Sequence, residues 1–324
     1  MNTGKVLFAY DGSACANDAL EDLQRAGFPS ELDLMGVSVA EVWVLEDDEE
    51  EKEQLELSGP TVAHGIIMSE RAKAGLDRAR IFARHAAHMI RERFPAWTVD
   101  TSVYPDSPAW GVLHAAEKWN PDMIVLGSQG RSALSRFFLG SVSQKVLAEA
   151  KCSVRIARHR AMVNGAPVRL LAGLDGTPDS DAVVDAIASR NWPAGSSVKL
   201  LSAVGPVGVF VDPVFAYDVI QWEGAARQWE RMEQVTSEAA ARLREAGLLV
   251  DTTVRDGAPG QLLLDEAEEL GADCIFVGAR GHRFWERFLI GSVSSAVAAR
   301  SGCSVEVVRT VKVAGESAGQ KNVS

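Results

Sequence analysis

Cysteine, long apolar runs and excess positive charge are all scarce in this sequence of 324 residues. The four cysteines, Cys15, Cys152, Cys274 and Cys303, show neither Cys-x-x-Cys nor Cys/His ligand spacing. Neither a zinc site nor a disulfide framework is therefore indicated, and we expect buried, reduced thiols. No apolar run approaches the about 20 residues that a membrane-spanning helix needs. Residues 1–11 lack the pattern of a signal peptide, so we expect a cytoplasmic protein.

Acidic residues outnumber basic ones, and the formal net charge is −11. A protein that binds nucleic acid nonspecifically uses a basic stripe to displace counterions from phosphates, and the sequence offers none. Its 47% hydrophobic and 24% charged residues are typical of a globular protein, long enough for two domains of about 150 residues each. Neither nucleic acid nor a membrane is expected as a partner.

The chain contains an internal duplication. Residues 121–158 align with residues 272–309 without a gap, and roughly two residues in five coincide. A second match joins Asp11-Gly12-Ser13 to Asp175-Gly176-Thr177. Gly165 and Pro167 suit a linker between the two copies. We therefore predict a first domain over residues 1–160, a second over residues 166–310 and a flexible tail over residues 311–324.

Each copy alternates short apolar runs with amphipathic helices, which predicts an α/β fold with a parallel sheet and helices on both faces. Long helices are expected near residues 68–93 and 224–246, and Thr177-Pro178 supplies an N-cap and a first helical residue. In such sheets ligands bind beyond the carboxyl ends of the strands. Residues 205–222 fall outside the pattern, as a longer loop, a lid or a partner-binding patch. The predicted strands lie near residues 6–10, 34–39, 98–103, 123–126 and 153–157, and near 170–174, 198–204, 250–255, 274–277 and 304–308.

The most informative segment follows the fourth strand of each copy. Gly127-Ser-Gln-Gly130 precedes Gly140-Ser141 by nine residues, and Gly278-Ala-Arg-Gly281 precedes Gly291-Ser292 by nine residues. Glycines let backbone amides approach an anion, and a helix N-terminus adds unpaired amides, while the serine hydroxyls can donate or cap the helix. The alternative is that the glycines only turn the chain and close the helix against the strand. Duplication at the same spacing favours a phosphate site.

With an aspartate closing the first strand, this pattern resembles the ATP-binding type of universal stress protein, twice over almost the whole chain. The resemblance implies two tandem doubly wound domains related by a pseudo-twofold axis, each with a five-stranded parallel sheet of strand order 3-2-1-4-5. The final strands resemble the family's dimerising edge, so the halves are expected to pair with each other, and a homodimer of chains is a further option. Asp106 replaces the glycine that is usual after the third strand and is kept at Gly257.

The same resemblance assigns binding roles in each copy. Asp11 and Asp175 would accept hydrogen bonds from the ribose of ATP, and Val39 and Ala203 would contact adenine. No P-loop lysine is present, so amides, hydroxyls, Mg²⁺ and side chains such as Arg131, Arg280 or His282 would meet the phosphate charge. The positions implied to hold ribose and phosphates are Gly127, Gly130, Gly140, Ser141 and Val142, with Gly278, Gly281, Gly291, Ser292 and Val293.

No residue emerges as a general base, so no catalytic residue is predicted and at most slow ATP hydrolysis is expected. His85 and His88 are three residues apart on a predicted helix, a spacing that can bind metal. With no third ligand in view, a solvated helix face is favoured over a metal site.

The resemblance favours a nucleotide-binding regulatory module, whose ATP occupancy controls assembly or partner choice in a stress response. The alternative is a slow hydrolase of the adenine-nucleotide α-hydrolase group, which carries Ser-Gly-Gly-x-Asp-Ser where this chain has Asp11-Gly12-Ser13. A scaffold that has lost its ligand is a third option, although both copies keep their glycines. Arg131 in one loop and His282 in the other give the two sites different charge, so their affinities are expected to differ.

Overall fold

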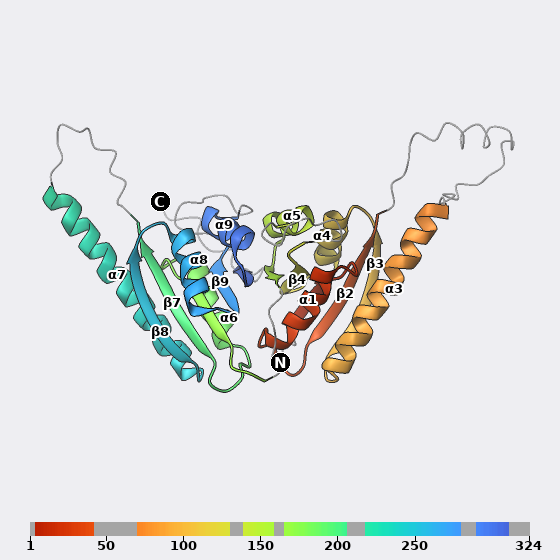
Figure 1. The fold of residues 1–324 in the computed structure, drawn as a ribbon, viewed down its shortest axis with the longest axis horizontal. Helices are drawn as coiled ribbons and strands as arrows, with labels where there is room; N and C mark the ends of the chain where they lie inside the picture. Colours follow the sequence, from red (N-terminus) through yellow and green to blue (C-terminus); the bar gives the residue numbers. More distant parts are fainter. Residues whose placement is uncertain are drawn as a thin grey trace, which may run out of the picture.

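The computed structural model describes residues 4–41, 70–129, 139–158, 165–205, 218–279 and 290–310. Over these residues strands and helices alternate through β1 to β5 and again through β6 to β10 (Figure 1). The predicted α/β fold with two tandem halves is confirmed. The exact domain limits stay a prediction, and the tail predicted over residues 311–324 lies outside the described residues.

The two halves have the same order of elements. The first half comprises β1 (Lys5–Ala9), α1 (Ala14–Asp22), the short 3-10 helix η1 (Leu23–Arg25), β2 (Asp33–Ala40), α3 (Glu70–Arg93), β3 (Thr98–Pro105), α4 (Pro108–Trp119), β4 (Met123–Gly127), α5 (Ser141–Glu149) and β5 (Ser153–Ala157). The second comprises β6 (Arg169–Gly173), α6 (Pro178–Ala188), β7 (Ser197–Val204), α7 (Asp218–Glu245), β8 (Leu249–Asp256), α8 (Pro259–Leu270), β9 (Cys274–Gly278), α9 (Ser292–Arg300) and β10 (Ser304–Val308).

Helix α7 begins at Asp218, six residues before the start predicted at Gly224. A glycine inside a helix costs only about 1 kcal/mol relative to alanine, so the helix continues through Gly224. The end of the segment 205–222, which had been set apart as a loop, lid or patch, is therefore helical. Residues 206–217 lie outside the described part of the chain.

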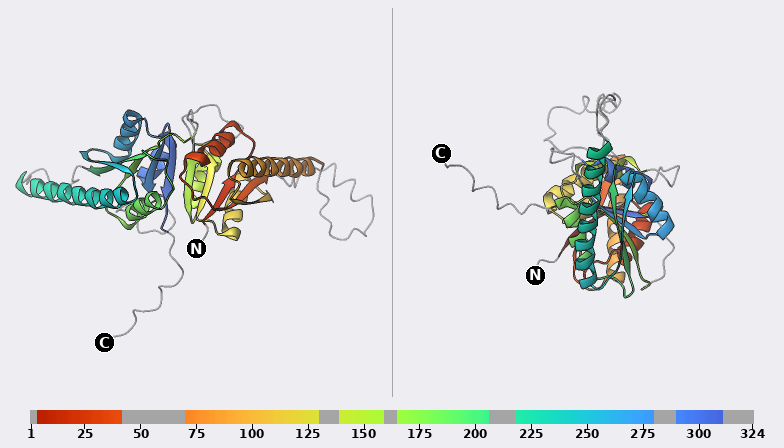
Figure 2. Two further views of the ribbon diagram at one scale, coloured as in Figure 1. Left: turned by 90° about the horizontal axis from the view of Figure 1, so that it is seen from below. Right: turned by 90° about the vertical axis from the view of Figure 1, so that its left-hand side faces the viewer.

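The strands form one ten-stranded sheet of order β3-β2-β1-β4-β5-β10-β9-β6-β7-β8. Within each half the strands are parallel and follow the predicted order 3-2-1-4-5. Between the halves β5 and β10 pair antiparallel, with Arg155 opposite Glu306. Figure 1 shows the halves as two arms of a V, and Figure 2 shows them end to end along the long axis.

Three buried clusters fill the space between the sheet and its helices. Side chains of α4, α5, α8 and α9 share one cluster that runs across both halves, and these helices lie between the arms in Figure 1. On the other face α1 and α3 cover the first half, and α6 and α7 cover the second. Strand β4 is buried along its whole length, as expected for a parallel strand covered on both faces.

The seam between the halves is built from reciprocal hydrogen bonds. Arg158 follows β5 and donates from Nη2 to the carbonyl of Ala298 in α9 (2.6 Å), while its amide donates to Ser304 Oγ (3.1 Å). Arg309 follows β10 and makes the equivalent bonds to Leu147 O (2.6 Å) and Ser153 Oγ (3.1 Å). Each arginine therefore neutralises the carbonyl end of a helix in the opposite half. None of the described helices is both long and apolar enough to cross a bilayer.

Candidate functional site

The loop after β1 holds Asp11 at the carboxyl end of the sheet. Its Oδ1 accepts the amide of Ser13 (2.9 Å), and Ser13 Oγ in turn accepts the amide of Ala16 (3.1 Å), which caps α1. Gly12 between them has a φ of +77°, a left-handed conformation that favours glycine. The sequence Asp-Gly-Ser thus sets both the position of the carboxylate and the start of the helix.

The loop after β6 repeats this turn with more hydrogen bonds. Asp175 Oδ1 accepts the amide of Thr177 (3.1 Å), its hydroxyl (2.6 Å) and the hydroxyl of Ser180 (2.9 Å). Thr177 and Ser180 also form a capping box at the start of α6, and Pro178 stands in the first turn. The N-cap and the proline position predicted from the sequence are confirmed.

The predicted adenine positions lie beside these aspartates. Because Ala9 pairs with Val37, Val39 is level with Asp11 two residues further along β2. The pairing of Gly173 with Leu201 places Ala203 beside Asp175 in the same way.

Two buried serines that the sequence argument did not single out hold these strand ends together. Ser38 Oγ donates to Tyr10 O (2.6 Å) in the first half, and Ser202 Oγ donates to Leu174 O (2.8 Å) in the second. Their equivalent positions in the two copies are the signal that could have revealed them.

Gly127 and Gly278 end β4 and β9, where the first turn of a helix packs against the strand. A Cβ on Gly127 would lie 2.5 Å from the carbonyl oxygen of Cys15 in α1. A Cβ on Gly278 would lie 2.9 Å from Asp179 Cβ in α6. These two glycines therefore allow α1 and α6 to pack on the strand ends, a contact that differs from the alternative raised from the sequence, the closure of the following helices. The same packing brings the N-termini of α1 and α6 to the edge of the sheet.

Gly140 and Gly291 are the N-caps of α5 and α9, and neither helix has a side-chain cap. The amide of Gly140 donates to Ser128 O (2.8 Å), and that of Gly291 donates to Ala279 O (2.7 Å), so each glycine is fixed just outside its helix. Ser141 and Ser292 are the first helical residues, and the suggestion that their hydroxyls cap the helix is wrong. Helix amides in this first turn have no acceptor within the helix, which is the arrangement that binds anions.

A second pair of serines missed from the sequence ties these helices to the strands. Ser143 Oγ donates to Gly127 O (2.8 Å) and Ser294 Oγ donates to Gly278 O (2.5 Å). Both serines are buried, and the shared Ser-Val-Ser at the start of α5 and α9 is the sequence signal that marks them. Val142 and Val293 lie between the serines and pack against the buried cluster shared by α4, α5, α8 and α9. The other predicted site residues, Gly130, Arg131, Gly281 and His282, lie outside the described residues.

Aromatic side chains surround the aspartate loop of the first half. Tyr10 donates its hydroxyl to Asn17 Oδ1 (2.6 Å) and meets the Phe82 ring edge-on at 6.4 Å. Burial, and secondly the charge of Asp11, raise the pKa of Tyr10, so its hydroxyl stays protonated. The second half has Leu174 at this position, and Val235 lies closest to a Cβ built on Gly176. The two loops have the same backbone conformation, but different side chains surround them.

The loop after the third strand also differs between the halves. Gly257 has a φ of +140°, whereas Asp106 is not left-handed; its Oδ1 accepts the Ser107 amide (2.7 Å) and its Oδ2 lies 2.8 Å from His114 Nδ1. The aspartate is tolerated because the backbone there takes another conformation. His85 and His88 are both exposed on α3, as expected for a solvated face. Within the described residues no group of three or more His, Cys, Asp or Glu side chains could hold a metal ion.

Known proteins match this chain along most of its length. The profile of the Universal stress protein family matches residues 2–158 and 168–309. The chain is 29% identical over 190 residues to a universal stress protein of Mycobacterium tuberculosis, covering 58% of this chain and 62% of that protein. It is 28% identical over 232 residues to one of Mycolicibacterium smegmatis, covering 65% of this chain and 69% of that protein.

A solved structure extends the match to the whole fold. A universal stress protein from Archaeoglobus fulgidus superposes with a TM-score of 0.63 at 21% identity, covering 95% of this chain and 97% of that chain. This likeness concerns the fold alone. In sequence, the chain spans less than two thirds of the length of the M. tuberculosis relative.

Proposed function

Because the chain belongs to the universal stress protein family, we propose that each half binds one ATP, with or without Mg²⁺, and that site occupancy controls assembly or partner choice in a stress response. The proposed contacts are those implied by the resemblance. Asp11 and Asp175 accept ribose hydroxyls, Val39 and Ala203 lie against adenine, and the amides at the starts of α5 and α9 hold phosphate.

One observation carries the proposal: in both halves the same three features lie at the carboxyl ends of the neighbouring second, first and fourth strands. These features are an aspartate at the end of the first strand, a small apolar residue level with it on the second strand, and a helix N-terminus without a side-chain cap. In the order 3-2-1-4-5 the chain reverses direction across the sheet between strands 1 and 4. Ligands of open α/β sheets bind at this switch point.

The described residues supply binding groups and no evident catalytic ones. Asp175 accepts three hydrogen bonds from its own loop, which suits a carboxylate that orients a ligand and not one that accepts a proton. No cluster for a catalytic metal is present among the described side chains. We therefore propose retention of nucleotide in preference to rapid turnover. A hydrolase is the competing outcome of the experiment below.

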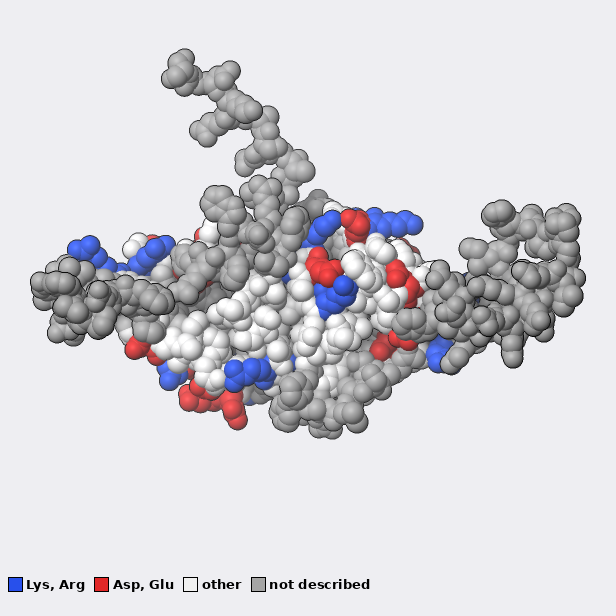
Figure 3. All heavy atoms as spheres, turned by 90° about the horizontal axis from the view of Figure 1, so that it is seen from above, with Lys and Arg blue, Asp and Glu red and all other residues white. Residues whose placement is uncertain are grey.

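The charge distribution supports a small-molecule ligand over nucleic acid. Seen from above, the described Lys, Arg, Asp and Glu side chains form small groups of mixed sign (Figure 3). No continuous basic surface crosses the described part of this face. A polyanion would find few places to displace its counterions.

The direct test is to purify the full chain, denature it and identify any released nucleotide by chromatography. We expect about two adenine nucleotides per chain, one for each helix N-terminus. Asp11→Asn and Asp175→Asn keep the acceptor for the loop amide but remove the charge, so each should lower occupancy by about one. Asp77→Asn, on the exposed face of α3, is the matched control and should leave occupancy unchanged.

Three results would contradict the proposal in different ways. Absence of bound nucleotide, together with no binding by calorimetric titration, would indicate a scaffold. Steady accumulation of AMP and pyrophosphate would indicate the hydrolase. Equal occupancy in wild type and both aspartate variants would show that the ligand binds elsewhere.

A further inference from the structure

The seam between β5 and β10 has its pseudo-twofold axis at one residue pair. Val305 pairs with Ile156, Glu306 with Arg155 and Val307 with Val154. Arg155 and Glu306 occupy equivalent positions in the two copies, so the axis passes between them. If two copies of the first half paired in this register, Arg155 would face Arg155. Two copies of the second half would bring Glu306 against Glu306.

The reciprocal arginine contacts of the seam cannot distinguish like from unlike halves, whereas one-sided contacts such as the ion pair of Arg25 with Asp273 can, because two copies of the second half would lack Arg25. Arg158 and Arg309 each donate to a helix carbonyl and to a serine, and both halves offer the same acceptors at the same places. These bonds would form in any of the three pairings. They stabilise the seam without selecting the partner.

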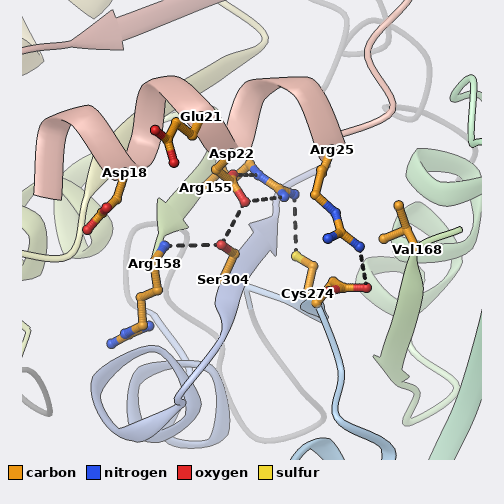
Figure 4. A pocket seen from close by; sticks show the side chains of 10 residues that line it. Asp18, Glu21, Asp22, Arg25, Arg155, Arg158, Val168, Cys274 and Ser304 are labelled. Carbon is orange, nitrogen blue, oxygen red and sulfur yellow. Dashed lines mark hydrogen bonds and ion pairs between the residues drawn. The ribbon is translucent and has the colours of Figure 1, made fainter. Parts of the chain in front are cut away.

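Four charges at the axis, three of them on buried residues, alternate in sign. Asp22 of α1 accepts hydrogen bonds from Arg155 Nε (2.6 Å) and Nη2 (3.1 Å). Arg155 Nη1 donates to Glu306 Oε2 (3.1 Å). Glu306 also accepts two hydrogen bonds from Arg190, at 2.5 and 2.9 Å. Arg155 is 1% exposed and Glu306 is 0% exposed. Figure 4 shows Asp22 between Arg155 and Ser304, whose hydroxyl donates to Asp22 across the seam (2.8 Å).

We infer that Arg155 and Glu306 select the partner at this edge: β5 accepts β10 and rejects a second β5, and β10 likewise rejects a second β10. The occupant of the edge is then the other half of the same chain. This inference does not depend on whether either half binds a nucleotide.

The selection depends on which charges lie side by side at the seam and not on the net charge of the cluster. Asp22 and Arg155 belong to the first half, and Glu306 and Arg190 to the second, so each half carries its own counter-charge. Like pairing would stay neutral but would place two equal charges side by side at the centre. Solvent does not screen charges that are fully buried, so this contact is strongly unfavourable. Burial alone would lower the pKa of Arg155, but Asp22, Cys274 and Glu306 outweigh it and raise the pKa.

Charge reversal in the full chain tests the inference. Arg155→Glu places a second carboxylate opposite Glu306, and Glu306→Arg places a second guanidinium opposite Arg155, so neither variant can pair its own strands or those of an identical chain. Each should lower the melting temperature by roughly 10 °C and speed hydrogen exchange at β5 and β10. The double variant restores opposite signs and should recover at least half of that loss.

The two single variants should also complement each other when mixed. The mixture offers one native seam and one with reversed signs, so native mass spectrometry should detect a two-chain species that neither variant forms alone. Lys151→Glu is the matched control, because its partner Glu117 and the lysine are both exposed. It should shift the melting temperature by about 2 °C or less.

The inference is overturned if either reversal behaves like the control, or if the double variant shows the sum of the single losses and the mixture no two-chain species. If both reversals prevent folding, Arg155→Met and Glu306→Met replace them. A Met/Met double variant leaves Asp22 and Arg190 as a neutral pair and should be more stable than either single variant. Additive losses in that set would also overturn the inference.

Discussion

The two halves of the molecule make the same arginine contacts at their seam but differ in the loops where each would hold a ligand. At the seam, Arg158 and Arg309 make the same bonds with the same 2.6 Å contact to a helix carbonyl. At the first-strand loops, Ser180 donates to Asp175, but Ala16 occupies the equivalent position near Asp11 and has no hydroxyl. The arginine contacts across the seam have been kept in both copies, whereas the charges at its axis and the first-strand loops differ between the copies.

The largest effects should come from the seam arginines. Arg158→Ala and Arg309→Ala each remove a guanidinium that satisfies a helix carbonyl in the other half, leaving that carbonyl without its charged donor. We expect each to lower the free energy of unfolding by about 3 kcal/mol, with the two values within about 1 kcal/mol of each other. Urea denaturation measures both, and Arg80→Ala on the exposed face of α3 is the control. A near-neutral result for one arginine alone would contradict the prediction that the two arginines stabilise the seam equally.

Substitutions at the strand-end glycines Gly127 and Gly278 should destabilise the two halves to different extents. Gly127→Ala forces a methyl group to within 2.5 Å of the Cys15 carbonyl, a backbone atom that cannot move without shifting α1. In Gly278→Ala the nearest atom is Asp179 Cβ at 2.9 Å. We expect losses of about 3 and about 2 kcal/mol respectively, since overpacking costs grow with the closeness of the contact. Gly302→Ala, which meets nothing within 4 Å, should be neutral, and equal losses at Gly127 and Gly278 would contradict the ordering.

Alkaline pH should destabilise the protein through the buried thiols Cys152, whose equivalent in the second half is Cys303, and Cys274, whose equivalent in the first half is Met123. Burial raises the pKa of Cys152 to about 11, and it raises that of Cys274 as well. A raised thiol pKa means that the folded state holds the proton more tightly than the unfolded state. This contribution to stability is therefore present below the unfolded pKa of 9.0 and is lost as the pH rises through about 11.

Cys152→Ala removes one of these thiols, so its unfolding free energy should fall less steeply between about pH 9 and 11, by about 2 kcal/mol in total. Denaturation curves at several pH values measure the slope. The slope that remains should come in part from Cys274. Parallel pH profiles for wild type and variant would show that Cys152 does not titrate in this way.

Local signals in the sequence were enough for the framework of the fold. Apolar runs such as the one at residues 123–126 predicted buried strands, and Thr177-Pro178 predicted the start of a helix, because both depend on neighbouring residues. The duplicated glycines and aspartates lie together at the carboxyl ends of the strands, and the ligand site expected there stays a prediction. The predicted positions Asp11, Val39 and Gly127 lie on three adjacent strands, β1, β2 and β4, or directly after them.

Contacts between distant segments could not be predicted in this way. Arg155 is the only charged residue of strand β5, and its partners Asp22 and Glu306 are 133 and 151 residues away in the sequence. Nothing near Arg155 indicates that its charge is buried and paired. The clash that makes Gly127 necessary arises from Cys15, which packs on it only after the sheet has formed. Such constraints belong to the tertiary structure, and the repeat alone does not specify them.

The smallest effect expected is also the most direct test of how the loops diverged. Ser180→Ala gives the second half the residue of the first half and removes one donor to Asp175 together with one side of the capping box. We expect the free energy of unfolding to fall by about 1 kcal/mol, the usual cost of losing a cap. If Asp175 also binds ribose, one fewer internal donor should raise nucleotide affinity in the second site by roughly threefold.

The two measurements separate local structure from ligand binding. Ser189→Ala, which removes an exposed hydroxyl bonded to Ala186 O at the end of the same helix, is the control and should change neither quantity. Unchanged stability in Ser180→Ala would show that the capping box contributes nothing and that the extra bonds in the second loop are incidental. A loss of stability without a change in affinity would show that the cap stabilises the fold but does not tune binding. The difference between the two sites would then lie outside Asp175, and Ser128-Gln129 and Ala279-Arg280 would be the next positions to exchange.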